Sequence, residues 1–429
     1  MKIIINPQRS TWPELVNRPQ QSPEELENIV LQVFEDIKLN GDAALLKYTE
    51  IFDKVSINSV LVDPAELKNS DLAVAQDLQD ALRLAKGNIE KFHASQVQNK
   101  GRIETSKGVV CWRENRAIEK VGIYIPGGTA PLLSTVLMLG IPAKLAGCKE
   151  IVLCTPPGKN GKINSAILFA AKLTGITSVY KVGGIQAIGA LTFGTESIPR
   201  VDKIFGPGNQ YVTASKLMAQ RNGTAIDMPA GPSELLIIGD KSGVPEFIAA
   251  DILSQAEHGE DSQVIFLSDN EQLILDVIKA LHIQLAELPR KDIANAALKN
   301  SKAILLKDIH ECLEFSNLYA PEHLILAIEN PYTMIDGICN AGSVFLGNYS
   351  CESAGDYASG TNHTLPTNGY ARTYSGVSLD SFVKKITFQE ISKEGLQNIG
   401  PAIELMAAEE QLTGHKNAVS IRLKTLSYV

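Results

Sequence analysis

The sequence predicts an α/β protein built from two parallel-sheet domains, and three features of the chain support this. With 429 residues, it exceeds the roughly 100 to 200 residues usual for one domain. Hydrophobic residues make up 44% and charged residues 21%, which is the balance of a globular protein. From Lys120 onward, short apolar runs that end at Gly or Pro alternate with helical patterns, as in successive βα units.

The chain before these units is expected to be mainly helical. Ser22 and Pro23 supply an N-cap and a first helical residue ahead of an apolar helical pattern that runs to Ile37. Gly41 is suited to a left-handed helix stop, and a further helix is expected over 43–48.

Two series of strand candidates follow. Each strand is followed by a helical stretch, which indicates parallel sheets covered by helices. The two series are similar in style, which is consistent with an internal duplication, although no residue-level repeat supports it. The first series comprises 121–125, 151–154, 179–182 and 203–205, and the second comprises 235–238, 264–267, 303–306, 324–327 and 344–346.

The end of the chain has a different character. The polar stretch from Gly347 to Arg372 is too long for a plain connector, so a functional loop is expected there. After Ser375 the pattern is helical, and the last fifty or so residues are too few for a core of their own. They are expected to pack on another surface, such as that of a partner subunit.

Charge and hydropathy exclude several classes of function. The formal net charge is −8 and no block of Lys or Arg occurs, which argues against nucleic-acid binding. No signal peptide or membrane-spanning stretch is expected, so the predicted location is the cytoplasm. The six cysteines include no Cys-x-x-Cys pair and are interpreted as reduced, mostly buried thiols. A catalytic cysteine is the less favoured alternative.

Three glycine turns stand where a strand gives way to a helix, the place where backbone N–H groups receive phosphates. They are Gly127-Gly128, Gly183-Gly184 and Gly206-Pro207-Gly208. None completes Gly-x-Gly-x-x-Gly, because Tyr211 occupies the place of the last glycine in the third turn. The glycines alone therefore leave a nucleotide site and simple tight turns as equal alternatives.

Gln255 and His258 are three residues apart, so on a helix both project from one face. Such a pair either binds a metal or caps a helix end, and Gln is an uncommon zinc ligand. Asp356 and His415 would complete a mixed oxygen and nitrogen set that suits zinc.

Glu322-His323 begins an apolar strand and offers groups suited to proton transfer. The alternative is a solvated acid beside a structural histidine. His363 lies in the polar stretch, where a supporting role and plain solvation explain it almost equally well.

Six segments, taken together and in order, resemble the histidinol dehydrogenase family over nearly the whole chain. They include most of the candidate residues named above, among them Gln255, His258, Asp356, His363 and His415, which makes chance a poor explanation. The segments are 124–131, 205–209, 227–234, 254–259, 355–363 and 415–419.

This resemblance implies an NAD-dependent, four-electron oxidation of L-histidinol to L-histidine through L-histidinaldehyde, with one zinc ion per subunit and two NAD⁺ consumed. Glu322 and His323 would form the acid/base pair. Zinc would be bound by Gln255, His258, Asp356 and His415, and NAD by Tyr124, Gln186 and Asn209. The residues implied in substrate binding are Ser233, Gln255, His258, His323, Asp356, Glu410 and His415.

The resemblance also implies two incomplete Rossmann-like domains with small terminal extensions, in an intertwined homodimer. The expected division is an extension over 1–21, a metal-binding domain over 22–123 and 234–377, an NAD domain over 124–233, and a helical tail over 378–429 that completes the partner's site. Two alternatives remain, which are a zinc-dependent hydrolase and a non-catalytic zinc-assembled dimer.

Overall fold

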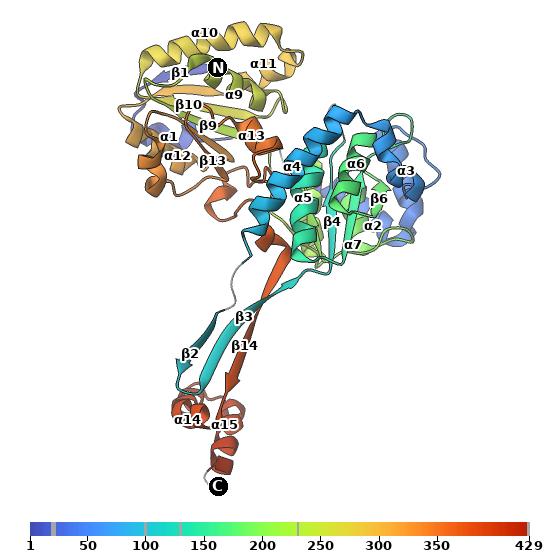
Figure 1. Cartoon of the computed structure of the whole chain (residues 1–429), viewed down its shortest axis with the longest axis vertical. Coiled ribbons are helices and arrows are strands. Elements are labelled where there is room, and N and C mark those ends of the chain that lie inside the picture. Colours follow the sequence, from blue (N-terminus) through green and yellow to red (C-terminus); the bar gives the residue numbers. More distant parts are fainter. Residues whose placement is uncertain (19–22, 98–100, 128–130, 230, 427–429) are drawn as a thin grey trace. The chain divides into compact units, whose positions relative to one another are not determined.

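The computed structural model describes residues 1–18, 23–97, 101–127, 131–229 and 231–426, and the chain forms two compact units (Figure 1). Unit 1 comprises Met1–Ser95 and Ile118–Ser381, and unit 2 comprises Gln96–Ala117 and Phe382–Val429. Ser22 of the expected helix start and Gly128 of the first glycine turn lie outside the described residues.

Unit 1 contains a five-stranded parallel sheet with Rossmann strand order. The first three strands along the chain extend to one side and the last two to the other, so the order reverses between β4 and β7. The four predicted strands are confirmed, and β8 was missed because two residues show no period. In spatial order the strands are β6 (Ser178–Lys181), β5 (Glu150–Thr155), β4 (Lys120–Tyr124), β7 (Lys203–Phe205) and β8 (Ala225–Ile226).

Two groups of helices accompany this sheet. One group is α2 (Pro23–Tyr48), α7 (Gly184–Phe193) and α8 (Gln210–Arg221), which pack on one another. The other is α4 (Gln76–Ala94), α5 (Leu133–Ala146) and α6 (Ser165–Thr174), with the short α3 (Pro64–Lys68) beside α6.

The packing of α2 differs from the expected domain division. Val30, Phe34 and Ile37 of α2 share one buried cluster with Ile185 and Ile188 of α7. Helix α2 therefore packs with the expected NAD domain, whereas the sequence analysis placed it with the domain over 234–377. The break expected within this region is confirmed, since Gly41 interrupts α2 with φ +49°.

The second sheet of unit 1 has six parallel strands and repeats the order of the first. Strands β9 to β13 again place three strands to one side and two to the other, and β1 adds an edge strand. All five predicted strands are confirmed, and the shared order is consistent with an internal duplication. In spatial order the strands are β1 (Lys2–Ile5), β11 (Lys302–Leu305), β10 (Gln263–Ser268), β9 (Glu234–Gly239), β12 (His323–Ala327) and β13 (Ser343–Leu346).

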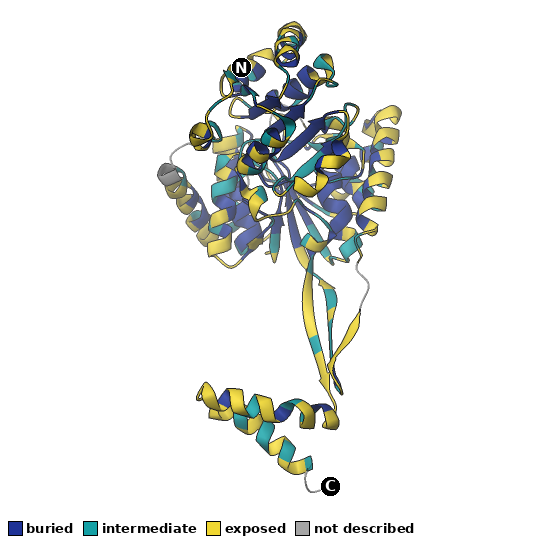
Figure 2. Ribbon diagram, turned by 90° about the vertical axis from the view of Figure 1, so that its left-hand side faces the viewer, coloured by how far each residue is buried: buried dark blue, intermediate teal, exposed yellow. Residues whose placement is uncertain are grey.

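Helices cover both faces of the six-stranded sheet. In β9, Leu235 and Ile237 enter one buried cluster while Leu236 and Ile238 enter another, because successive side chains point to opposite faces. The inner strands of both sheets are buried accordingly, whereas the edge strand β1 is largely exposed (Figure 2). The first cluster is covered by α9 (Pro245–Ala256), α10 (Glu271–Glu287) and α11 (Lys291–Lys299), and the second by α1 (Trp12–Leu15) and α12 (Ile309–Tyr319).

The long polar stretch contains a short helix, α13 (Glu352–Tyr357), which the sequence analysis did not anticipate. Within the described residues, no helix combines the length and the apolar character required to cross a bilayer.

Unit 2 is an antiparallel sheet with two helices, so the expected all-helical tail is wrong in its first part. Strand β14 (Val383–Ile391) pairs with β3 (Val109–Ala117), and β3 pairs with β2 (Arg102–Ser106). The helices α14 (Lys393–Glu409) and α15 (Thr413–Leu426) pack on each other. Backbone pairing with β3 stabilises β14 as a strand, although its side chains are mostly exposed (Figure 2).

Candidate functional site

The candidate site lies at the amino edge of the six-stranded sheet. Glu234 and His323 are the first residues of β9 and β12, which pair in parallel. Because α9 follows β9 and runs back along the sheet, its end returns to the same edge. Gln255 and His258 lie there, with His258 Nδ1 3.4 Å from Gln255 Nε2 and 3.5 Å from Ser233 Oγ.

Helix α13 adds two acidic side chains around His323. Asp356 Oδ1 lies 3.7 Å from the His323 Nε2 atom, and Glu352 Oε1 lies 3.7 Å from Nδ1 of the same ring. One ligand-type atom from each of these three residues falls within 4.8 Å of the others. Carboxylates and an imidazole in this arrangement are suited to a divalent cation.

His363 connects α13 to the other sheet's helices. Its Nδ1 lies 2.8 Å from the Asp356 carbonyl oxygen, and its Nε2 lies 2.9 Å from Thr135 Oγ1 on α5. These contacts hold the end of α13 in place, and a supporting role for His363 stays a prediction.

Burial dominates the electrostatics of the site. Glu322 is 7% exposed and His323 is 3% exposed. Burial raises the pKa of Glu322 well above its ordinary value and lowers the pKa of His323 to about 4. Burial likewise raises the pKa of Glu352 and lowers that of His258. A bound cation would instead lower the pKa of the nearby carboxyl groups, because it favours their charged forms.

Several buried polar atoms at the site lack a hydrogen-bond partner among the described residues, which is unusual in a folded protein. These atoms are Gln255 Oε1, His323 Nε2, Asp356 Oδ1 and both carboxyl oxygens of Glu352. The oxygen and nitrogen donors fit zinc. Gln255 and His258 adjoin each other, and the Asp356 charge opposes the fall in the pKa of His258. Three of the four expected ligands therefore lie in this part of unit 1.

The fourth expected ligand belongs to unit 2. His415 lies on α15, and Glu410 follows the last residue of α14; both side chains are exposed. Unit 1 alone therefore does not contain the full expected set.

Two of the three expected NAD contacts, Tyr124 and Asn209, lie at or just after the ends of the strands at which the order of the five-stranded sheet reverses, whereas Gln186 lies in α7, after the edge strand β6. Tyr124 ends β4, and Gly206 follows β7 in a conformation with φ +131°. A Cβ on Gly206 would lie 2.1 Å from the Tyr124 carbonyl oxygen, so close approach of the two turns requires this glycine. The crevice outside such a reversal is where α/β sheets bind nucleotides.

The side chains of Tyr124, Gln186 and Asn209 each make a hydrogen bond within the same part of unit 1. The Tyr124 hydroxyl accepts a hydrogen bond from Gly184 N at 3.1 Å, and Gln186 Nε2 donates to Asp53 Oδ2 at 3.2 Å. The Asn209 side chain caps α8. Burial raises the pKa of Asp53 to about 6.

Sequence reasoning missed Glu352 and the role of Glu234. Glu352 precedes Asp356 by four residues, so a helix prediction inside the polar stretch would have placed both on one face. Glu234 is a buried acid at the start of an apolar strand, and because acids are rarely buried without a partner, this position alone indicates a special role. Only Cys154 and Cys312 of the six cysteines are buried, so the expectation of mostly buried thiols is wrong. Burial raises the pKa of these two thiols, which suits packing rather than catalysis.

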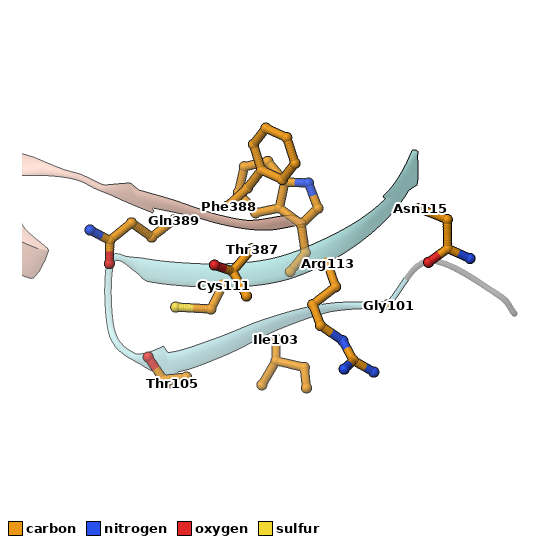
Figure 3. A pocket seen from close by; sticks show the side chains of 10 residues that line it. Gly101, Ile103, Thr105, Cys111, Arg113, Asn115, Thr387, Phe388 and Gln389 are labelled. Atoms are coloured by element: carbon orange, nitrogen blue, oxygen red, sulfur yellow. The ribbon is translucent and has the colours of Figure 1, made fainter. Parts of the chain in front are cut away.

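Unit 2 carries a separate open groove of about 770 Å³ on its sheet (Figure 3). Its lining mixes apolar and polar side chains, and none of the residues predicted for the site is among them. The labelled lining residues include Ile103, Cys111, Arg113, Thr387 and Phe388.

Comparison with known proteins decides the family. The family described as histidinol dehydrogenase matches residues 16–423 of the sequence. The chain belongs to the histidinol dehydrogenase family. This membership confirms the resemblance and makes the chain an oxidoreductase, so the hydrolase and the non-catalytic alternatives are set aside.

Individual members of the family are similar to this chain over nearly its whole length. A histidinol dehydrogenase of Bacteroides thetaiotaomicron is 56% identical over 426 residues, covering 99% of this chain and 100% of the relative. The crystal structure of histidinol dehydrogenase from Elizabethkingia anophelis has a TM-score of 0.98 at 62% identity, covering 100% of this chain and 99% of that one.

A more distant structure shares the fold alone. An acetylating aldehyde dehydrogenase from Geobacillus thermoglucosidasius has a TM-score of 0.50 at 15% identity, covering 86% of this chain and 98% of that one.

Proposed function

We propose that the chain oxidises L-histidinol to L-histidine through L-histidinaldehyde, using NAD⁺ and zinc, in the last steps of histidine biosynthesis. The observation that supports this most is the buried Glu322–His323 pair, with Asp356 Oδ1 3.7 Å from His323 Nε2, in a member of this family. An acid/base pair adjoining a cation site is what alcohol oxidation with substrate anchoring requires.

Gln255, His258 and Asp356 would bind the zinc ion together with a His415. When bound, zinc anchors the imidazole and amino nitrogens of the substrate and so fixes its position. Ser233, His323 and Glu410 would also contact the substrate. Tyr124, Gln186 and Asn209 would bind NAD⁺, which when bound supplies the hydride acceptor.

His323 performs the proton transfer of the first oxidation. Its Nδ1 lies 3.3 Å from the Glu234 carbonyl oxygen, which holds the ring hydrogen there and leaves the lone pair on Nε2. The lowered pKa of His323 keeps Nε2 unprotonated at neutral pH. Nε2 accepts the proton of the substrate hydroxyl as the carbinol carbon loses a hydride, which yields the aldehyde.

Glu322 acts on the aldehyde. Its carboxylate takes a proton from a water molecule, whose oxygen bonds to the aldehyde carbon. His323 returns its proton to the former carbonyl oxygen, which completes the hydrate and leaves Nε2 free to accept again. The hydrate then loses a second hydride and His323 accepts the second hydroxyl proton, which leaves the carboxylic acid. Two hydrides account for the four electrons that separate an alcohol from a carboxylate.

The stoichiometry of the reaction tests this proposal. Purified zinc-loaded protein is incubated with limiting L-histidinol and excess NAD⁺, while reduced nicotinamide and histidine are measured. Two reduced nicotinamides per histidine are expected, because the nicotinamide accepts only one hydride at a time. A ratio of one, or histidine formed without reduced nicotinamide, would contradict the proposal.

The chain is further proposed to act as a homodimer with shared sites. Unit 2 carries two of the expected site residues and exposes apolar side chains that a partner would cover. Among them, Leu405 is 73% exposed and Ile421 is 64% exposed. We place this dimer in the cytoplasm, as the composition predicts, with no nucleic-acid or membrane partner.

Subunit complementation is expected to restore activity if sites are shared. Glu322→Gln is defective in unit 1 and His415→Ala in unit 2, so a mixed dimer has one doubly defective and one intact site. Random mixing after reversible dissociation should recover about a quarter of wild-type activity, since half of the dimers are mixed and each regains one of two sites. Mixing two preparations of Glu322→Gln is the control, and no recovery in the mixed sample would argue for sites within one chain.

A further inference from the structure

A buried ion pair outside the expected catalytic set lies directly behind the acid/base pair. Arg18, from the N-terminal segment, donates from Nε to Glu234 Oε1 at 2.5 Å and from Nη2 to Glu234 Oε2 at 2.8 Å. The side chains are 11% and 3% exposed. Asn368 N also donates to Glu234 Oε1 at 2.7 Å. The Glu234 side chain is therefore held from two directions.

The backbone of Glu234 orients both members of the acid/base pair. Its N–H donates to Glu322 Oε2 at 2.9 Å. Its carbonyl oxygen lies 3.3 Å from His323 Nδ1 and fixes which ring nitrogen carries the hydrogen. A small movement of this one peptide segment would therefore misalign Glu322 and His323 together.

Arg18 also holds the turn that leads into Glu322. Nη2 donates to the Tyr319 carbonyl oxygen at 2.8 Å, and the guanidinium lies over the Tyr319 ring at 4.0 Å. The next residue, Ala320, has φ +55°, a left-handed conformation that is unfavourable for alanine. The hydrogen bond and the ring contact help to keep this strained turn in place.

We infer that Arg18 is a positioning residue, which aligns Glu322 and His323 by fixing Glu234 on one side and the Tyr319–Ala320 turn on the other. A planar guanidinium suits this task because it makes a forked hydrogen-bond pattern with a carboxylate while stacking on a ring. The inference about catalysis rests on the proposed function, whereas the geometry of the His323 ring can be examined independently of it.

The test uses the double variant Arg18→Met/Glu234→Gln, which leaves no unpaired buried charge and so favours folding. Arg9→Ala is the matched control, because Arg9 is an arginine of the same segment that is 63% exposed and pairs with Glu311 and Glu314. With folding checked by circular dichroism, kcat should fall about 100-fold in the double variant with KM nearly unchanged, as expected for misaligned reacting groups. Arg9→Ala should match the wild type.

A second measurement separates positioning from simple stabilisation. In protein labelled with ¹⁵N-histidine, the His323 resonances are assigned by their loss in His323→Asn. The wild type should show the hydrogen on Nδ1, and the double variant should show a mixture of both tautomers. An unchanged His323 signal in the folded double variant would overturn the inference, as would an unchanged kcat. If the wild type itself failed to oxidise histidinol, the proposed function would fail while the NMR comparison still decided the role of Arg18.

Discussion

Glu322→Gln is expected to stop the reaction halfway. In the proposed mechanism the first oxidation needs only the proton transfer by His323, so one reduced nicotinamide should form rapidly per active site. Hydration of the aldehyde then lacks its base and should slow by about 10² to 10⁴ fold, the usual contribution of general base catalysis. Glutamine preserves the hydrogen bond from Glu234 N through its carbonyl oxygen, so the local structure should be retained.

His323→Asn provides the contrasting result, since in the proposed mechanism His323 accepts a proton in both oxidations. No rapid first turnover is expected in this variant. Rapid-mixing measurement of reduced nicotinamide distinguishes the two variants. A Glu322→Gln protein that forms two equivalents at the wild-type rate, or one that loses the first turnover as well, would refute the division of labour between the two residues.

The sheets were predictable because their strands are buried on both faces. Continuous apolar runs such as Leu235 to Ile238 and Val264 to Leu267 stand out against polar surroundings. The partner of α2 was not predictable, since an amphipathic helix shows that one face is buried but not which sheet buries it. The local sequence pattern therefore predicts individual strands and helices better than it predicts which of them pack together.

The strands of unit 2 were missed for a related reason. β3 and β14 pair residues that are far apart in the chain, such as Trp112 with Phe388. Their side chains are mostly intermediate or exposed, so no apolar run marks them. Backbone hydrogen bonds between distant segments leave little trace in either segment alone.

In the candidate site, likewise, contacts between residues close in the chain were predictable and contacts between distant segments were not. Gln255 and His258 could be paired from helical spacing, because both residues lie close together in the chain. Their approach to α13 and to the first residue of β12 depends on how α9 returns along the sheet, which spacing does not give. Glu234 acts mainly through its backbone, and a backbone group at the start of a strand has no side-chain signature.

Removal of the metal is expected to abolish turnover while both sheets remain folded. The three ligands in unit 1 come from α9, the turn after it and α13, and none belongs to the apolar clusters that cover the six-stranded sheet. A cation bound there positions substrate more than it holds the fold, unlike the metal of a small metal-dependent domain. Chelator-treated protein should keep its far-ultraviolet circular dichroism and regain activity when zinc is restored.

The same expectation can be examined by substitution. His258→Asn should lose the metal, measured by elemental analysis, and most of its activity. His282→Asn changes an exposed histidine of α10 and should retain both. Loss of the native circular dichroism on chelation would mean that the cation stabilises the sheet edge itself. Full activity in metal-free protein would mean that Gln255, His258 and Asp356 serve the substrate directly.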